Sequence, residues 1–338
     1  MSRFQPEPPH GAQQQARVGI LLINLGTPAA PTPEAVRPYL REFLSDPRVV
    51  ELPRLLWQPL LRGIILPFRA KKSAHGYRQI WQREGSPLAI ITARQAAALQ
   101  ACLPPQILVA YAMSYGTPSV ADAVAAMKAQ GVDRLLAIPL YPQYAASSSG
   151  AALDKVLSAL LKQRNQPSLR TISRFYNHPD YIQAMAAHIR AYWQQHGRGQ
   201  RILFSFHGIP EAAVQQGDPY QAECQASARL LAEALQLSAQ EWYVSFQSRF
   251  GGGRWIGPAT SGLLTELPAK HNIRELDVFC PGFVSDCLET LEELAIKGRE
   301  QFHEAGGRTF RFIPCLNDSP AFIQALADLA QENLAGWV

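Results

Sequence analysis

A histidine at the end of an apolar run is the first residue whose position suggests chemistry. His207 stands in RILFSFHGIPE (201–211), after a segment that is typical of a buried strand. Gly208 and Pro210 follow it and stop any regular continuation. An imidazole at this point can exchange protons near neutral pH or bind a divalent metal ion. The alternative is a histidine that only hydrogen-bonds to the backbone of its turn.

A row of carboxylates forms the second candidate group. Asp286, Glu289 and Glu293 follow the spacing i, i+3, i+7, and Glu292 lies beside them. A helix predicted over 285–304 would place the first three on one face. Carboxylates leading to a histidine would form a path for divalent cations or for protons. The alternative is a solvated acidic helix face.

Aromatic, amide and hydroxyl side chains cluster in three further segments. These are YPQYAASSSG (141–150), GDPY (217–220) and WYVSFQSRFGGGRW (242–255). Such side chains at strand ends favour a wide, flat-walled pocket. The glycines at 251–253 match neither the phosphate-binding G-x-x-x-x-G-K-[ST] pattern nor the dinucleotide-binding G-x-G-x-x-G pattern.

The composition is that of a globular chain with room for two domains. The chain has 338 residues, of which 47% are hydrophobic and 17% charged, so it can bury a sizeable core. The net charge of +5 is mild and spread along the chain, so we expect no nucleic-acid partner. Residues 1–16 are polar and lack the apolar core of a signal peptide, so we expect a flexible tail. No apolar stretch is long enough to span a membrane, and we expect a cytoplasmic protein.

Seven short apolar runs alternate with helical patterns. The runs are 18–25, 106–113, 134–141, 201–206, 241–246, 275–280 and 308–315. Amphipathic segments lie between them, among them 119–130, 178–195 and 221–236. Buried runs that are each followed by a helix indicate parallel sheets with helices on both faces, so the predicted fold class is α/β.

The two halves of the chain resemble each other. VGILLINLGTP in the first half matches RILFSFHGIPE in the second, and two later strand-and-turn segments match in the same order. The pattern predicts two similar lobes, and Leu25 then occupies the place that His207 has in the other half. Because ligands of open α/β sheets bind at the carboxyl ends of strands, both residues are expected to face a cleft between the lobes.

The predicted domain organisation follows from this match. The N-terminal lobe covers 17–165, the C-terminal lobe covers 166–315, and a final helix in 316–338 packs back on the lobes. An insertion at about 30–85 carries two tryptophans, many Leu and Ile, and a set of basic residues. The basic residues are Arg62, Arg69, Lys71, Lys72, Arg78 and Arg83. Apolar surface flanked by cations suits a lip that contacts an anionic membrane or admits a large apolar anion, and the alternative is a helical cap packed on its own lobe.

Several motifs in their order resemble those of one family. LLINLGTP, YPQY, SFHGIP, GDPY, SFQSRFG and CPGFVSDCLETLEE resemble ferrochelatase, over roughly residues 17–330. The resemblance implies insertion of Fe²⁺ into a porphyrin, with protoporphyrin IX expected, by two Rossmann-like lobes around a cleft. It also implies a porphyrin substrate, a heme product and a lyase-class activity in heme synthesis. The iron donor stays open.

The resemblance assigns roles to residues of both candidate groups. His207 and Glu289 match the catalytic pair, and we expect His207 to act as the base with Glu289 assisting. Glu293 and Asp286 would continue the acidic route, so that all four are expected to contact the metal or its protons. The positions that match the porphyrin pocket are Leu25, Tyr141, Tyr220, Gln247, Ser248, Trp255 and Phe283.

The chain departs from some relatives at four positions. Cys315 is alone near the C-terminus, and the remaining cysteines, 102, 224, 280 and 287, show no C-x-x-C spacing, so we expect no iron–sulfur cluster and no permanently bound cofactor. Cys287 stands where some relatives have a histidine. Lys297 ends the acidic row, and Ser114 replaces a basic residue that would meet a propionate.

Three other functions are weighed against this one. A chelatase for another tetrapyrrole or metal would rely on more histidines, and only His207 of the eight stands in a motif. A non-catalytic porphyrin or heme carrier would need no acidic row behind its ligand. A bilobed solute-binding protein would share the architecture but not the His207–Glu289 pair. We expect membrane contact only at the periphery, through the lip and at the inner face of the membrane.

Overall fold

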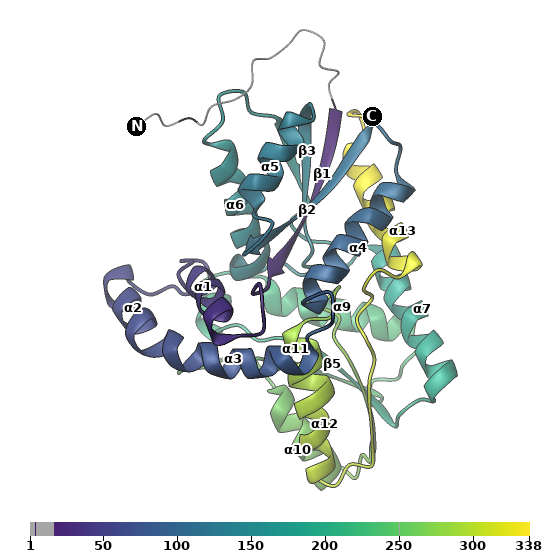
Figure 1. Cartoon of the computed structure of the whole chain (residues 1–338). Coiled ribbons are helices and arrows are strands. Elements are labelled where there is room, and N and C mark those ends of the chain that lie inside the picture. The colour runs from purple at the N-terminus through teal and green to yellow at the C-terminus, as the bar shows by residue number, and fades with distance from the viewer. Residues whose placement is uncertain (1–3, 5–16, 250) are drawn as a thin grey trace. The chain divides into compact units, whose positions relative to one another are not determined.

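The apolar runs of the sequence form two parallel sheets. The computed structural model describes residue 4, residues 17–249 and residues 251–338 (Figure 1). The strands of one sheet lie in the order β2-β1-β3-β4, and those of the other in the order β6-β5-β7-β8. All neighbouring strands pair in parallel. Each sheet therefore has the carboxyl ends of its strands at one edge, and the predicted α/β class is confirmed.

Each predicted run overlaps one strand. The first sheet consists of β1 (Arg17–Gly26), β2 (Ile107–Tyr115), β3 (Val132–Pro139) and β4 (Ser168–Thr171). The second consists of β5 (Arg201–His207), β6 (Trp242–Gln247), β7 (Glu275–Phe279) and β8 (Thr309–Phe312). Only β4 has no counterpart among the predicted strands, because Leu169 is its single large apolar side chain.

The chain forms two compact units, one around each sheet. The first unit consists of Met1–Leu140, Ala146–Arg174 and Ile323–Val338, and the second of Tyr141–Ala145 and Phe175–Phe322. The first unit extends past the predicted boundary at residue 165 because β4 pairs with β3. The predicted tail, 1–16, lies outside the described residues except for Phe4.

In the first unit, helices cover both faces of the sheet. They are α1 (Pro33–Leu44), α2 (Arg54–Leu60), the π-helix η1 (Leu61–Ile65), α3 (Leu66–Ile80), α4 (Pro87–Cys102), α5 (Val120–Ala129), η2 (Ala146–Gly150) and α6 (Ala151–Leu160). Helices α5 and α6 lie on one side of the strands and α4 on the other (Figure 1). The segment from α1 to α3 is the predicted insertion. Helix α13 (Pro320–Leu334) begins in the second unit, and its larger part belongs to the first.

The second unit contains the helices α7 (Pro179–His196), α8 (Glu211–Gln215), α9 (Tyr220–Ala234), α10 (Thr260–Lys270), α11 (Leu288–Thr290), the π-helix η3 (Leu291–Gly298) and α12 (Arg299–Glu304).

The acidic segment of this unit differs from its prediction. The predicted helix over 285–304 begins only at Leu288, because Cys287 is in an extended conformation and caps α11 together with Thr290. Asp286 therefore lies in the preceding loop, and the predicted single face of three carboxylates is wrong.

The two units repeat one arrangement at the end of their first strand. Gly26 follows Leu25 at the end of β1, and an added Cβ would come within 1.7 Å of the Tyr115 carbonyl oxygen in β2. Gly208 follows His207, and an added Cβ would come within 3.0 Å of the Gln247 carbonyl oxygen in β6. Both positions need glycine for this close approach of two backbones. Leu25 and His207 are therefore structurally equivalent, as the matched halves predict.

A buried carboxylate lies inside the second sheet. Asp277 of β7 is fully buried, and its Oδ2 accepts hydrogen bonds from Trp193 Nε1 at 2.7 Å and from the Gly199 amide at 2.8 Å. Its Oδ1 lies 3.6 Å from Arg311 Nη1. Burial raises the pKa of this carboxyl above the ordinary value of 3.8, although these donors and Arg311 act in the opposite direction.

The raised pKa of Asp277 gives a prediction for stability. The folded protein binds the proton more tightly than the unfolded chain does, so the contribution of Asp277 is fully present below the unfolded pKa and is lost as pH rises through the folded pKa. The Asp277→Asn variant has no titrating carboxyl at this position, so it does not lose this contribution to stability as pH rises. Urea unfolding of both proteins from pH 4 to 7 should show the stability advantage of the wild type shrinking as pH rises. Parallel stability curves would contradict the prediction.

Candidate active site

His207 ends β5 with its ring partly exposed. Its Nδ1 lies 2.6 Å from the Gly208 carbonyl oxygen. Because a carbonyl oxygen only accepts hydrogen bonds, Nδ1 carries the proton and the neutral ring keeps its lone pair on Nε2. That nitrogen can accept a proton or contact a metal ion.

The carboxamide of Gln247 connects three elements beneath His207. Gln247 pairs with His207 in the register of β6 and β5. Its Oε1 accepts a hydrogen bond from Ser205 Oγ at 2.6 Å, and its Nε2 donates to the Glu289 carbonyl oxygen at 2.8 Å. The buried amide therefore sets the backbone of α11 against the ends of β5 and β6.

Glu293 brings the acidic segment to the end of β6. Ser248 follows β6, and its amide donates to Glu293 Oε1 at 2.7 Å while its hydroxyl donates to Oε2. Burial raises the pKa of the Glu293 carboxyl; the Ser248 bonds and His207 lower it, and Glu289 raises it further. His207 and Glu289 are thus each close enough to Glu293 to affect its pKa. The bonds of Gln247 and Ser248 bring the Glu289 backbone and the Glu293 carboxylate to the strand ends beside His207.

The carboxylate of Asp286 is engaged by the protein. Its Oδ1 accepts hydrogen bonds from Thr290 Oγ1 at 3.0 Å and the Cys315 amide at 3.3 Å. Its Oδ2 accepts one from Asn317 Nδ2 at 2.8 Å. The side chain is buried. This pattern favours a positioning role for Asp286 over the predicted contact with the metal.

The residues predicted to line a porphyrin pocket fall into two groups. Tyr220 and Gln247 are buried, and burial raises the pKa of the Tyr220 hydroxyl, which lies beside the Cys224 thiol and the His207 backbone. The partly exposed members in the second unit are Tyr141, Ser248, Trp255 and Phe283. Leu25, also partly exposed, belongs to the first unit.

Two residues that hold this site were missed in the sequence. Asn317 bonds to Asp286, and Thr260 Oγ1 lies 2.9 Å from Ser205 Oγ, behind Gln247. The signal for Asn317 was its place in CLNDSP, where an asparagine precedes Asp-Ser-Pro in a turn. Nothing in the local sequence distinguishes Thr260 from other helix-start hydroxyls.

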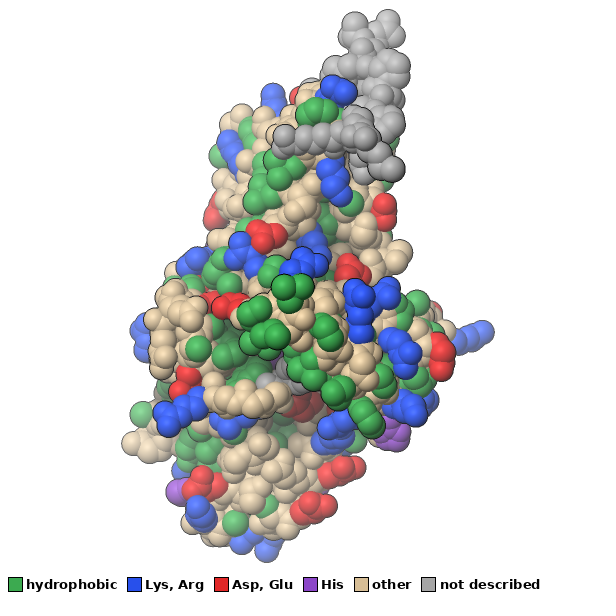
Figure 2. All heavy atoms as spheres, turned by 90° about the vertical axis from the view of Figure 1, so that its left-hand side faces the viewer, with side chains coloured by type: hydrophobic (Ala, Val, Ile, Leu, Met, Phe, Trp, Pro, Cys, Tyr) green, Lys and Arg blue, Asp and Glu red, His purple; other side chains and the backbone are tan. Residues whose placement is uncertain are grey.

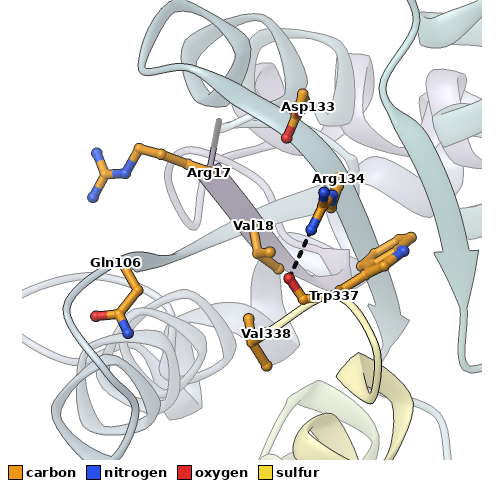
Figure 3. Close-up of a pocket in the computed structure, with 7 residues that line it drawn as sticks. All are labelled: Arg17, Val18, Gln106, Asp133, Arg134, Trp337 and Val338. Atoms are coloured by element: carbon orange, nitrogen blue, oxygen red, sulfur yellow. Dashed lines mark hydrogen bonds between the residues drawn. The ribbon is translucent and has the colours of Figure 1, made fainter. Parts of the chain in front are cut away.

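The side chains of the site do not form a ready-made metal cage. In the residues that the structure describes, no three His, Cys, Asp or Glu side chains are grouped so as to hold a metal ion. A pocket of about 220 Å³ lies elsewhere, at the amino ends of β1 and β3 (Figure 3). Arg134 there donates to the Trp337 carbonyl oxygen at 2.8 Å, and Arg170 stacks on the Trp337 ring. This pocket is at the edge of the sheet opposite Leu25.

The predicted lip is helical and carries an exposed apolar surface. Leu55 is 90% and Phe68 is 75% exposed, on α2 and α3. The lip surface consists of Leu52, Leu55, Leu56, Leu60, Ile64 and Phe68. Exposed Arg54, Arg62, Lys71 and Lys72 border it in the sequence, and Figure 2 shows apolar and basic side chains interspersed over this face. The opposite side of this segment is packed through Trp57, Leu61 and Tyr77, as a helical cap predicts, and contact with a membrane or a large apolar anion stays a prediction. Within the described residues, no helix is long and apolar enough to cross a bilayer.

Comparison with known families and proteins gives one consistent result. The family model named Ferrochelatase matches residues 17–334. A ferrochelatase of Neisseria gonorrhoeae is 60% identical over 337 residues, covering all of both chains. A ferrochelatase of Nitrosomonas europaea is 50% identical over 341 residues, covering all of this chain and 93% of its own.

Solved structures share the fold at low sequence identity. SirB from Bacillus subtilis with Fe³⁺ is 12% identical, with a TM-score of 0.56, and the match covers 94% of this chain and 96% of SirB. CbiX, described as the terminal enzyme of siroheme biosynthesis in denitrifying bacteria, is 15% identical with a TM-score of 0.51, over 93% and 98% of the two chains. These likenesses support the two-lobed fold.

The bonds of Gln247 give a stability prediction. Gln247→Met keeps the volume but leaves the buried Ser205 hydroxyl and the Glu289 carbonyl without this partner. We expect a loss of about 1–3 kcal/mol in the free energy of unfolding, measured with urea. Gln301→Met is the matched control, since Gln301 also makes two side-chain bonds but is partly exposed, so that water can replace them, and it should lower stability by less than Gln247→Met does. Equal losses would contradict the assigned role of Gln247.

Proposed function

Since the chain belongs to the ferrochelatase family, whose members are lyase-class enzymes that insert Fe²⁺ into a porphyrin to make heme, we propose that His207 and Glu289 perform this reaction here, with protoporphyrin IX as the substrate. The observation that supports the assignment lies at the carboxyl end of the second sheet, where Gln247, the strand partner of His207, bonds to the Glu289 backbone and Ser248 bonds to the Glu293 carboxylate.

Metal insertion requires the removal of two protons. A free porphyrin carries two pyrrole N–H groups. Fe²⁺ replaces both protons, so the two positive charges that leave equal the two that enter. His207 accepts the first proton at Nε2, because its Nδ1–H is held by the Gly208 carbonyl. Glu289 assists, and Glu293 continues the path for protons and for Fe²⁺. The raised pKa of Glu293 makes its carboxylate a better proton acceptor than an exposed one.

The partly exposed aromatic and polar side chains form the porphyrin contacts in this proposal. Trp255 lies against the turn after His207, since Pro210 and Trp255 pair through their backbones. Phe283 precedes the acidic segment, and Ser248 holds Glu293. In this proposal Leu25 and Tyr141 keep the porphyrin contacts that the resemblance implies. Buried Tyr220 and Gln247 support these walls. Binding energy from such contacts can distort the planar ring and expose its nitrogens.

We propose that no iron–sulfur cluster is bound. Cluster iron requires thiolates, and burial raises the pKa of the Cys280, Cys287 and Cys315 thiols, which favours their neutral form. Purified protein should then lack sulfide-associated iron and visible charge-transfer absorption.

Activity of variants tests the catalytic assignment. Under anaerobic conditions with Fe²⁺, His207→Ala and Glu289→Gln should each lower kcat by about 10²–10⁴-fold while porphyrin binding, followed by tryptophan fluorescence, persists. Protoporphyrin IX and coproporphyrin III are compared in parallel to identify the substrate.

Matched controls use exposed residues of α12. His303 also has its Nδ1 against a backbone carbonyl, that of Gly307, at 3.1 Å. His303→Ala and Glu300→Gln should keep full activity. Wild-type turnover that survives in His207→Ala or Glu289→Gln would overturn the assignment, and porphyrin binding without metal insertion by the wild type would indicate a carrier.

We further propose that the lip surface contacts an anionic membrane at its periphery. Protoporphyrin IX has two carboxylates on a large apolar ring, so transfer at a bilayer surface would spare it a passage through water. Six exposed apolar side chains bordered by cations fit a headgroup boundary. Of the predicted basic residues, Arg69 is largely buried, whereas Lys71 and Lys72 are exposed.

Liposome co-sedimentation tests this proposal. Leu55→Gln with Phe68→Gln should weaken binding to vesicles that contain anionic lipid, and Lys71→Gln with Lys72→Gln should weaken it most at low salt. Leu157→Gln with Leu161→Gln, which removes two exposed leucines at the C-terminal end of α6, serves as the control. Unchanged binding in both lip variants would exclude the lip surface as the contact.

A further inference from the structure

Two segments that are distant in the sequence meet through a reciprocal pair of hydrogen bonds. The Asp286 amide donates to Asn317 Oδ1 at 2.8 Å, and Asn317 Nδ2 donates to Asp286 Oδ2, also at 2.8 Å. The Asn317 amide adds a bond to the Val284 carbonyl oxygen at 2.8 Å. The turn before α13 therefore holds the loop before α11 at three points.

The other carboxylate oxygen of Asp286 extends this hold into the helix. Thr290 Oγ1 lies 3.0 Å from Asp286 Oδ1 and accepts from the Cys287 amide at 2.9 Å. Thr290 is fully buried, and Asp286 is 6% exposed. Glu289 lies within this turn, between Cys287 and Thr290, so its backbone position depends on the same bonds.

We propose that Asp286 and Asn317 form a clamp that positions Glu289 and Glu293 for metal insertion. The inference deepens the proposed function and rests on the catalytic role of Glu289. In it, Asp286 and Asn317 are positioning residues, which act through the backbone of α11 and do not touch iron or porphyrin.

The residue type at 317 fits this role. Asn317 has φ = 52°, in the left-handed region that asparagine tolerates better than most residues. In the Asn317 side chain, Oδ1 accepts from the backbone amide of Asp286 and Nδ2 donates to the Asp286 carboxylate. An alanine would lose both bonds and strain the backbone, so Asn317→Gly is the cleaner deletion of the side chain.

Exchange of the two side chains tests the clamp. Asp286→Asn sets two amide donors against each other, and Asn317→Asp sets two carboxylates against each other. In the double variant, the new amide at 286 donates to the new carboxylate at 317, while the bonds from Thr290 and Cys315 are kept. We expect each single variant to lower kcat about tenfold or more with little change in the porphyrin KM, and the double variant to recover most of the loss.

The outcome separates positioning from metal contact. A double variant as slow as Asp286→Asn would overturn the clamp, because the carboxylate would then be needed at 286 itself. Single variants with wild-type kcat would overturn it as well. Glu289→Gln, assayed beside them, tests the proposed function. Full activity of this variant would show that Glu289 is not catalytic, whereas the exchange of residues 286 and 317 would still show whether their mutual bonds affect kcat.

A control distinguishes positioning from general loss of stability. Gln200 Oε1 accepts bonds from the Arg274 and Glu275 amides at the opposite end of β7. Gln200→Ala should lower the melting temperature yet leave kcat unchanged. If the charged single variants do not fold, Asn317→Gly replaces them: lowered kcat at an unchanged KM supports the clamp, and a wild-type kcat overturns it.

Discussion

The carboxamide of Gln247 is the contact on which the arrangement of the second unit's site depends. It is buried where β5, β6 and α11 meet, and both of its polar ends are used. A buried amide must satisfy its donor and its acceptor together, so its orientation is determined by Ser205 on one side and the Glu289 carbonyl on the other. Together with the bonds of Ser248 to Glu293, this side chain places the acidic segment relative to His207.

The same unit shows how an α/β sheet can present a histidine at the end of a buried strand. His207 is the last residue of a strand whose preceding residues, from Ile202 to Phe206, are buried. Gly208 lets the chain turn close to the Gln247 carbonyl oxygen, and that turn supplies the carbonyl that fixes the proton on Nδ1. The first unit repeats the backbone arrangement with Leu25, so one architecture presents an imidazole in one half and an apolar side chain in the other.

Much of this was readable from the sequence because the strands are continuous apolar runs and the site residues end them. The runs predicted seven strands and the equivalence of Leu25 with His207. The start of the acidic helix was not readable, because spacing alone does not reveal that Cys287 and Thr290 cap the helix after Asp286. Nor was the partnership with Asn317, since it joins segments 31 positions apart and depends on tertiary packing. The predicted cleft between the lobes stays a prediction.

The discontinuity of the first unit has a consequence for biosynthesis. Its strand β3 supplies Arg134 and its strand β4 supplies Arg170, whose carbonyl partners are Trp337, Asn333 and Ala335. Figure 3 shows the bond of Arg134 to Trp337. During synthesis from the N-terminus, both guanidinium groups obtain these partners only after the second unit has been made. The unit that emerges first from the ribosome is therefore completed by a segment that follows the second unit.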